Sequence, residues 1–251
     1  MTIRDSLTTI PCLSDNYAFL FETGGRRVLV DAPEAGPILA ALDGRPLTDI
    51  LLTHHHPDHV QGVAELVAAT GAKVWGAAAD AHRLPPLDHA LEPGDRIEIG
   101  TETGAVWDVS GHTIGHIAFV FDGVAFTGDS LMAAGCGRLF EGAPAQMLTS
   151  LRQFDTLPGE TLIASGHEYT GNNLAFARTL EPSNAQLISR IAEVERLRAE
   201  GEPSVPSVLE TERHTNPFLR AHIEAIKDAT GTSGQSDEAT FAATRRAKDA
   251  F

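Results

Sequence analysis

Apolar residues in the first part of the chain form short runs separated by turn residues. Residues 17–21 and 28–30 have the composition of strands, and Gly24-Gly25 between them is typical of a hairpin turn. Apolar residues then recur at helical spacing within 61–70. Strands and helices that alternate in this way predict an α/β layered fold.

The pattern changes in the last third of the chain. Within 184–200, apolar residues recur every three or four positions, and Gly201 ends the predicted helix. Another helix is expected over 236–251, with Ser236 or Asp237 as its N-cap. The sequence therefore predicts a helical domain after the α/β domain.

Composition places the chain among ordinary globular proteins. It has 251 residues, of which 42% are hydrophobic and 21% charged, so it can bury a sizeable core. No apolar run approaches the roughly 18 residues that span a bilayer. The first residues show neither a signal-peptide nor a transit-peptide pattern, so we expect a cytoplasmic protein without membrane association.

Charge and cysteine content exclude other classes. The net charge of −15 repels phosphate backbones and argues against nucleic-acid binding. The two cysteines, Cys12 and Cys136, are too few for a disulfide scaffold or a thiolate zinc site. An anionic substrate would need a local group of basic residues.

A cluster of metal-binding side chains follows the short apolar strand at 49–52. It consists of His54, His55, His56, Asp58 and His59. Residues two apart in an extended segment point the same way, so His54 and His56 can share one ion while His55 points elsewhere. Pro57 turns the chain and directs the last two ligands toward a second ion. Imidazole and carboxylate without thiolate suit zinc, iron or manganese at a reactive site.

Three later strands also end in a small-residue turn that presents a possible metal ligand. They are strand 105–109 before His112, strand 123–127 before Asp129, and strand 161–164 before His167. One histidine after a strand is weak evidence for a site. Four such units in one chain favour a site that is collected from the carboxyl ends of several strands.

With these motifs, the sequence resembles the metallo-β-lactamase superfamily and, within it, the glyoxalase II (hydroxyacylglutathione hydrolase) family. The superfamily motifs are Thr-His-x-His-x-Asp-His at 53–59, Gly111-His112, Thr127-Gly128-Asp129-Ser130 and Gly166-His167. The narrower resemblance rests on residues 134–138, 166–170, 172–174, 216–220 and 245–249, among others. It covers the entire chain.

The resemblance implies a four-layer αββα sandwich with a catalytic domain at 1–170 and a helical, glutathione-binding domain at 171–251. It also implies two divalent metal ions, with zinc as the first choice and iron or manganese as alternatives. The implied ligands are His54, His56 and His112 for one ion, Asp58, His59 and His167 for the other, and Asp129 as a bridge.

The implied reaction is hydrolysis of the thioester S-D-lactoylglutathione to D-lactate and glutathione, a step that removes methylglyoxal. Two ions about 3.5–4 Å apart lower the pKa of a shared water from about 16 to about 7. The hydroxide attacks the thioester carbonyl and the thiolate leaves. Asp58 and Asp129 are the carboxylates expected in the catalytic centre, and Asp31 is expected to orient a ligand imidazole.

The resemblance further implies glutathione contacts from Arg138, Phe140, Tyr169, Arg245 and Lys248. The family commonly has Lys at position 138 and Tyr at position 140. Arg138 keeps the positive charge, whereas Phe140 lacks a hydroxyl that could make one hydrogen bond, worth about 0.5–1.5 kcal/mol. Arg245 and Lys248 share a face of the predicted last helix, and Arg246 points away from it.

Two other function classes compete with thioester hydrolysis. A persulfide dioxygenase of the same superfamily uses a single iron and also has a Gly-Cys-Gly-Arg element, which matches residues 135–138. The long helical tail with Asn172-Asn173 argues against that oxidoreductase. A non-catalytic metal-binding module is disfavoured because no ligand position is missing.

Overall fold

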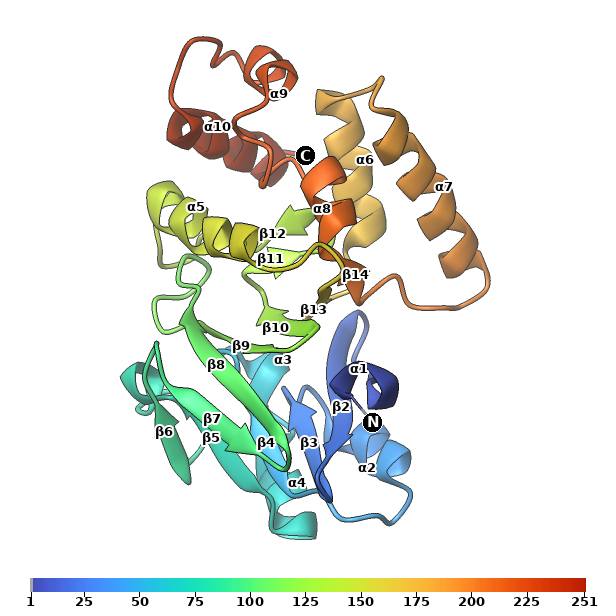
Figure 1. The fold of residues 1–251 in the computed structure, drawn as a ribbon, viewed down its shortest axis with the longest axis vertical. Helices are drawn as coiled ribbons and strands as arrows, with labels where there is room; N and C mark the ends of the chain where they lie inside the picture. Colours follow the sequence, from blue (N-terminus) through green and yellow to red (C-terminus); the bar gives the residue numbers. More distant parts are fainter. Residues whose placement is uncertain (1) are drawn as a thin grey trace. The chain divides into compact units, whose positions relative to one another are not determined.

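The computed structural model describes residues 2–251, and the chain divides into two compact units (Figure 1). The first unit comprises Met1–Val109, Gly115–Gly128 and Ala164–His167, and the second comprises Ser110–Ile114, Asp129–Ile163 and Glu168–Phe251. Each unit is therefore built from three separate segments of the chain. The domain boundary at 170/171 that the sequence suggests stays a prediction.

The first unit contains a six-stranded sheet with the order β1-β2-β3-β4-β5-β6. Its strands are β1 (Thr8–Cys12), β2 (Asn16–Thr23), β3 (Arg26–Val30), β4 (Asp49–Leu51), β5 (Lys73–Ala77) and β6 (His89–Leu91). The first three strands are antiparallel, and the turn between β2 and β3 is the predicted glycine hairpin. From β3 onward the pairing is parallel, which requires crossovers, and α2 (Ala35–Leu42) and α4 (Val63–Thr70) supply two of them.

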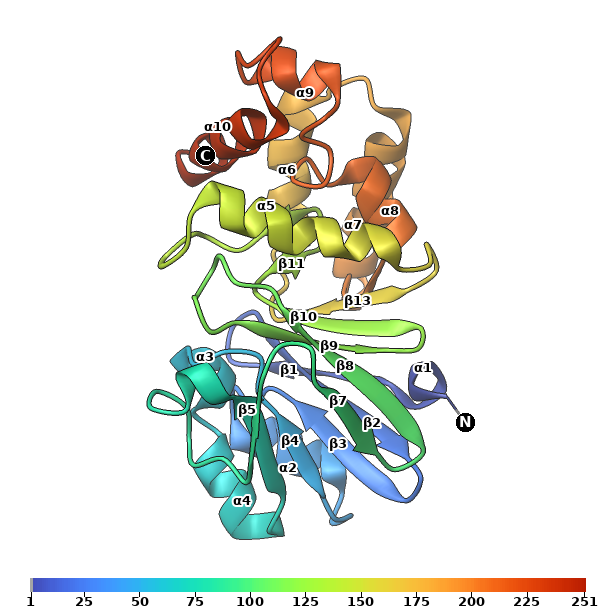
Figure 2. The ribbon, with the colours of Figure 1, turned by 60° about the vertical axis from the view of Figure 1, so that its left-hand side comes forward.

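Four antiparallel strands of a second sheet also lie in the first unit. They follow the order β10-β9-β8-β7, with β7 (Arg96–Ile99), β8 (Glu102–Asp108), β9 (Ile117–Phe121) and β10 (Val124–Gly128). Figure 2 shows β7 and β8 lying over the strands of the first sheet. The remaining short elements of this unit are α1 (Ile3–Ser6), α3 (Pro57–Val60) and the 3₁₀ turn η1 (Ala78–Asp80).

Alternation along β2 explains how these layers pack. Ala18 and Leu20 belong to the apolar core that also contains residues of α2 and α4. Phe19 and Phe21 point to the opposite face, where the Phe21 ring lies 5.6 Å from Phe121 of the second sheet. A fully buried strand of this kind needs apolar residues on both faces, as its sequence has.

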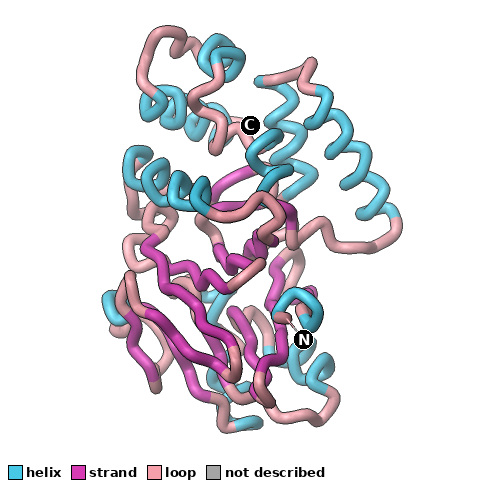
Figure 3. The backbone as a smooth tube through the Cα atoms, viewed as in Figure 1, coloured by secondary structure: helices cyan, strands magenta, loops and turns pink. Residues whose placement is uncertain are grey.

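Helices dominate the second unit after residue 168 (Figure 3). Its elements are β11 (Leu131–Met132), β12 (Gly135–Cys136), α5 (Pro144–Arg152), η2 (Gln153–Thr156), the start of β13 (Leu162–Ser165), α6 (Thr170–Leu180), α7 (Ala185–Ala199), β14 (Ser207–Val208), α8 (Leu209–Thr215), α9 (Glu224–Ala229) and α10 (Asp237–Asp249). Helix α7 confirms the predicted helix at 184–200, with Asn184 as its N-cap. Helix α10 begins after the Ser236 N-cap, one of the two caps expected.

The helical part is built on a small apolar core. Ala134, Leu174, Ala177, Leu187 and Val194 form one cluster in which the β11–β12 turn packs against α6 and α7. Between β14 and α8 there is no gap, so the two-residue strand leads directly into the helix. Among residues 2–251, no helix combines the length and apolar character needed to cross a bilayer.

Candidate metal centre and substrate site

Three predicted ligands converge within the first unit. His59 Nε2 lies 3.3 Å from His167 Nε2, and Asp58 Oδ2 lies 3.4 Å from the same His167 atom. His167 reaches this place because Gly166 follows β13, donates its N–H to the Gly128 carbonyl and accepts from Tyr17 N–H. Asp58, His59 and His167 therefore form one group with the spacing of metal ligands.

The hydrogen bonds behind these rings determine which nitrogens face the centre. His59 Nδ1–H donates to Asp31 Oδ2 at 2.8 Å, and His167 Nδ1–H donates to Asp15 Oδ1 at 3.0 Å. Both Nε2 atoms consequently carry lone pairs, which point toward each other and toward the Asp58 carboxylate. Lone pairs from two imidazoles and a carboxylate in such proximity fit a divalent cation.

Asp58 is held in its ionised form. The imidazole of His167, together with His59 and the amide of Asn16, keeps the pKa of the Asp58 carboxyl well below its ordinary value. The Asn16 side chain donates to both Oδ2 and the backbone carbonyl of Asp58. A carboxylate that is charged throughout the neutral range suits a metal ligand.

His54 and His56 also lie on one side of their extended segment, as predicted. His54 Nε2 is 3.1 Å from His56 Nδ1, and His54 Nδ1 lies 3.1 Å from Thr53 Oγ1. Because the Thr53 hydroxyl donates to Asp31, it accepts from His54 and leaves the Nε2 lone pair facing His56. The buried ring of His116 stacks on His54 at 4.6 Å and limits its rotation.

His55 points elsewhere, which confirms the prediction from strand alternation. Its Nδ1 lies 3.1 Å from Oδ2 of the buried Asp80, and Arg83 binds the other oxygen of that carboxylate. Gly115 allows this approach, because a Cβ there would lie 2.2 Å from the Asp80 carboxyl carbon. His55 therefore braces the loop without joining the ligand groups.

The second unit holds the remaining two predicted ligands. His112 Nε2 lies 3.5 Å from Asp129 Oδ2, and His112 Nδ1–H donates to the Arg138 carbonyl at 2.7 Å. The His112 lone pair thus faces a carboxylate that is only 5% exposed. Gly137 makes room for this pair, since a Cβ there would lie 2.0 Å from the Asp129 carbonyl oxygen.

Among the predicted substrate residues, Phe140 and Tyr169 are large side chains left open to solvent, with exposed fractions of 65% and 39%. The Phe140 ring packs edge-on against His112, which places it beside a predicted metal ligand. Arg138, at the end of the same segment, is exposed. The second unit thus carries predicted substrate residues directly beside His112.

The two cations of α10 have different environments. Arg245 is 5% exposed, and its guanidinium pairs with Asp249 and donates to the Cys136 carbonyl. Lys248 is half-buried and donates to the Asn172 carbonyl at 3.2 Å. Arg246 is exposed, so the predicted division of the helix faces holds.

Lys248 lies within a group of positive charges. Burial, followed by the charges of Arg245 and Arg138, lowers the pKa of its ammonium to about 8. Its Nζ also lies 5.5 Å from the Phe176 ring and 5.0 Å from the Phe251 ring. The charges of Arg245 and Arg138 close to the Lys248 ammonium form a favourable position for an anion in a chain of strongly negative net charge.

Neither cysteine is placed to act as a nucleophile. Both are buried, and burial raises the pKa of the Cys12 thiol and of the Cys136 thiol to about 11. Arg245 donates to the Cys136 sulfur and is no base. Nucleophilic catalysis by a cysteine therefore finds no support in these positions.

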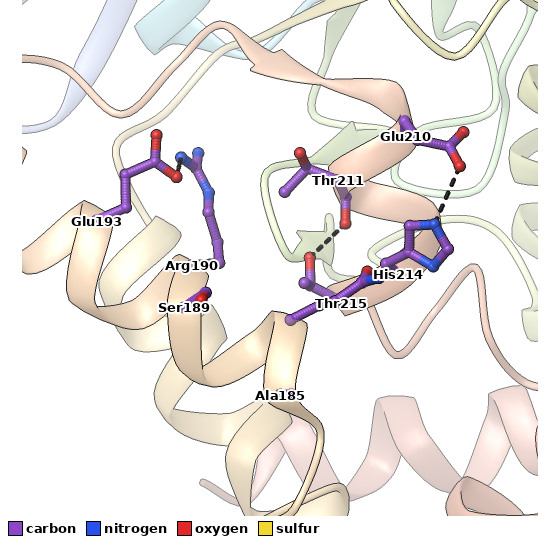
Figure 4. Close-up of a pocket in the computed structure, with 9 residues that line it drawn as sticks. Ala185, Ser189, Arg190, Glu193, Glu210, Thr211, His214 and Thr215 are labelled. Atoms are coloured by element: carbon purple, nitrogen blue, oxygen red, sulfur yellow. Dashed lines mark hydrogen bonds and ion pairs between the residues drawn. The ribbon is translucent and has the colours of Figure 1, made fainter.

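A separate hollow of about 450 Å³ lies between α7 and α8 in the second unit (Figure 4). Its charged residues bind one another: Arg190 donates to Glu193 at 2.8 Å, and His214 Nε2 lies 3.0 Å from Glu210 Oε1. No predicted site residue lines it. The hollow is a surface feature distinct from the ligand groups.

Several supporting residues are not evident from the sequence alone. Asp15 and Asn16 hold His167 and Asp58, Thr53 and His116 hold His54, and Asn172 binds Lys248. Asn172 belongs to one of the motifs of the family resemblance, but the sequence alone does not show that it contacts Lys248. Asp31 was expected to orient an imidazole, and its bond to His59 confirms that role.

Comparison with known proteins gives two family matches that together span most of the chain. Residues 13–167 match the model described as metallo-beta-lactamase superfamily, and residues 168–251 match the model described as hydroxyacylglutathione hydrolase C-terminus. A curated protein of Cereibacter sphaeroides called hydroxyacylglutathione hydrolase is 60% identical over 251 residues, and the match covers 98% of each chain.

Two solved structures illustrate the fold. The B3 metallo-beta-lactamase BLEG-1 is 22% identical with a TM-score of 0.65, and the match covers 85% of this chain and 99% of that one. A protein solved in a di-iron-bound form, TTHA1623, is 29% identical with a TM-score of 0.59 over 85% of this chain and 99% of its own. The α/β fold class predicted from the sequence is thereby confirmed as a metallo-β-lactamase fold with a C-terminal helical part.

Proposed function

Because the chain belongs to the hydroxyacylglutathione hydrolase family of the metallo-β-lactamase superfamily, we propose that it hydrolyses S-D-lactoylglutathione to D-lactate and glutathione. The chain is thus a thioester hydrolase that uses divalent metal ions. The observation that carries the proposal is the set of imidazole and carboxylate lone pairs in the ligand groups. In His59, His167 and His112, a hydrogen bond at Nδ1 directs the Nε2 lone pair toward the other ligands. Such groups suit metal-assisted hydrolysis.

The proposed ligand set retains the assignment made from the sequence. One ion would be held by His54, His56 and His112, the other by Asp58, His59 and His167, and Asp129 would be shared by the two. The di-iron form of the relative at 29% identity supports two ions rather than one. The chemistry that such a pair supplies is a water activated for attack at neutral pH and stabilisation of developing negative charge.

The residues of this chain contribute orientation. Asp15 and Asp31 fix the tautomers of two imidazoles, so their lone pairs face the centre before any ion or substrate arrives. This pre-organisation avoids a loss of side-chain freedom during the reaction. The leaving group is a thiolate, which departs readily, so no general acid is assigned.

For the substrate, we propose that the glutathione part contacts Arg138, Phe140, Tyr169, Arg245 and Lys248. The lowered pKa of Lys248, to which the charges of Arg245 and Arg138 contribute after burial, supports an anion there, because a bound carboxylate relieves the repulsion on the ammonium. Arg245 has donors already committed to Asp249 and the Cys136 carbonyl, so it serves the substrate site largely through the field of its charge.

Zinc as the metal, methylglyoxal detoxification as the role and the cytoplasm as the location complete the proposal. A ligand set of imidazole and carboxylate without thiolate suits a reactive zinc site, with iron or manganese as alternatives. Two free, buried cysteines are in keeping with a reducing compartment.

The purified protein should consume S-D-lactoylglutathione, followed as loss of thioester absorbance, and should release one free thiol per thioester cleaved. Parallel measurement of oxygen uptake with glutathione persulfide tests the dioxygenase alternative. Oxygen uptake with an intact thioester would overturn the proposal. Thiol release without oxygen uptake supports it.

The same preparation should contain close to two metal ions per chain, since seven candidate ligands with one able to bridge suit a binuclear centre. Elemental analysis of the isolated, active protein measures this directly. Chelation should remove activity together with the metal, and added zinc should restore both. A fully active protein with one ion per chain would contradict the proposed bridge by Asp129.

A further inference from the structure

A short hairpin in the second unit has an unusual turn. Strands β11 and β12 pair Leu131 with Cys136 and Met132 with Gly135, which leaves two residues for the turn. The second of these, Ala134, has a φ of +54°. A left-handed conformation is unfavourable for an L-residue other than glycine, so surrounding contacts must stabilise it.

Side chains from distant helices bind the backbone of this hairpin. Glu212 of α8 accepts from Ala134 N–H at 2.6 Å, and Asn216 donates to the carbonyls of Met132 and Gly135 at 3.0 and 2.9 Å. On the other side, Asn173 of α6 donates to the Ala133 carbonyl at 3.0 Å, and Arg245 of α10 donates to the Cys136 carbonyl at 2.9 Å. Five backbone groups of the hairpin are thus held by four side chains.

These four side chains are fixed themselves. Glu212 is 1% exposed, and Asn216 Nδ2 lies 3.1 Å from its carboxylate. Burial raises the pKa of Glu212, and its hydrogen bonds oppose that rise. Asn173 fits only because residue 135 is glycine, since a Cβ there would lie 2.5 Å from the Asn173 amide nitrogen. The contacts form one buried network rather than a set of surface bonds.

Both arms of the hairpin lead to the metal ligands of the second unit. The residue two positions before β11 is Asp129, and the residue two positions after β12 is Arg138, whose carbonyl accepts from His112. Gly137 N–H donates to the Ser130 carbonyl at 3.1 Å and ties the two arms together. Displacement of the hairpin would therefore move Asp129 and rotate His112.

We propose that Glu212, Asn216 and Asn173 are positioning residues of the metal centre, which act by holding the 131–136 hairpin and thereby set Asp129 against His112. The inference rests on the proposed function and assigns a role to side chains on α6, on α8 and at the C-cap of α8. Arg245 joins this network through Cys136, in addition to its charge near the substrate site.

Four variants test the inference, and Asn173→Ala is a fifth for the case in which Glu212→Ala does not fold. Glu212→Ala removes the acceptor for Ala134 N–H, and Glu212→Gln retains an oxygen there. Asn216→Asp replaces an amide donor by an acceptor that repels the two carbonyls. Arg213→Gln is the matched control, because Arg213 also lies on α8 and its guanidinium also holds backbone carbonyls. These belong to Phe154 in η2 and to Leu157 directly after it, apart from the hairpin.

The first measurement is metal retention by the purified holoenzyme against graded chelator concentrations, and the second is the steady-state kinetics of thioester hydrolysis. Glu212→Ala and Asn216→Asp should release metal at about 10–100-fold lower chelator concentration and lose kcat to a similar extent, which is typical when a partner behind a ligand is lost. Glu212→Gln should stay close to the wild-type protein. Arg213→Gln should lower the melting temperature with unchanged metal retention.

Wild-type metal retention in Asn216→Asp would overturn the inference, as would an equal loss in Arg213→Gln. If Glu212→Ala does not fold, Asn216→Asp and Asn173→Ala compared with Arg213→Gln decide the question. Failure of the proposed function is recognisable separately: the wild-type protein would then release no thiol from the thioester, while the chelator series would still report on the hairpin.

Discussion

Replacement of Asp129 by alanine should lower kcat/KM for the thioester by more than about 100-fold and leave fewer than two metal ions per chain. Loss of a residue that hydrogen-bonds a metal ligand typically lowers activity or metal affinity by about 10–100-fold. Loss of a carboxylate proposed to bind both ions should lower them by more. Asp129 is buried, and its carboxylate lies 3.5 Å from the proposed ligand His112. Kinetics and elemental analysis of the variant measure both effects.

His55→Ala is the control for this experiment, because His55 belongs to the same motif as the ligands but binds Asp80. Removal of the His55 imidazole should lower kcat/KM by less than about tenfold, the smallest loss typical for a residue that supports a metal ligand, and should leave the metal content unchanged. Equal losses in the two variants would mean that the assignment of ligands by strand alternation is wrong. A larger loss in His55→Ala would contradict that assignment equally.

Lys248→Ala should raise KM by about 10–150-fold with little change in kcat. A charge-assisted hydrogen bond is worth roughly 1.5–3 kcal/mol, and a contact remote from the reacting carbonyl is nearly equal in the ground and transition states. Arg245→Ala should raise KM and also lower kcat, since it frees the Cys136 carbonyl as well. Arg246→Ala, on the exposed face of α10, should change neither.

The pKa of Lys248 provides an independent check on the same contact. Its value of about 8 means that the ammonium loses its proton as the pH rises through 8, so KM of the wild-type enzyme should increase between about pH 7 and 9.5. Lys248→Arg should lose this dependence, because a guanidinium stays charged. Similar small changes of KM in Lys248→Ala, Arg245→Ala and Arg246→Ala would show that this face of α10 is a solvated surface.

Local patterns were sufficient to predict most of the elements and the ligand motifs. The two-residue period of an extended chain separated His54 and His56 from His55, and their observed partners agree with it. The three-four spacing of α7 and the cap at Ser236 were also evident in the sequence. Each of these features depends on neighbours within a few residues.

Features that depend on distant partners were not predictable in this way. Asp15 lies 152 residues from His167 in the sequence, and no local pattern joins a carboxylate to an imidazole so far away. Strands β11, β12 and β14 have two residues each, too few for alternation to be visible. The predicted helical domain also contains a strand, β14, which forms by pairing with the distant β13.

The burial of Cys12 and Cys136 limits the reaction of their thiols with disulfides. A hydrolase that liberates glutathione at each turnover works beside that thiol and any disulfide formed from it. An exposed cysteine thiolate attacks such a disulfide, forms a mixed disulfide and releases glutathione. With thiol pKa values of about 11, only about one side chain in ten thousand is ionised at pH 7, and the thiolate is the form that exchanges. The buried thiols are thereby protected from exchange with the disulfide of the glutathione that the enzyme releases.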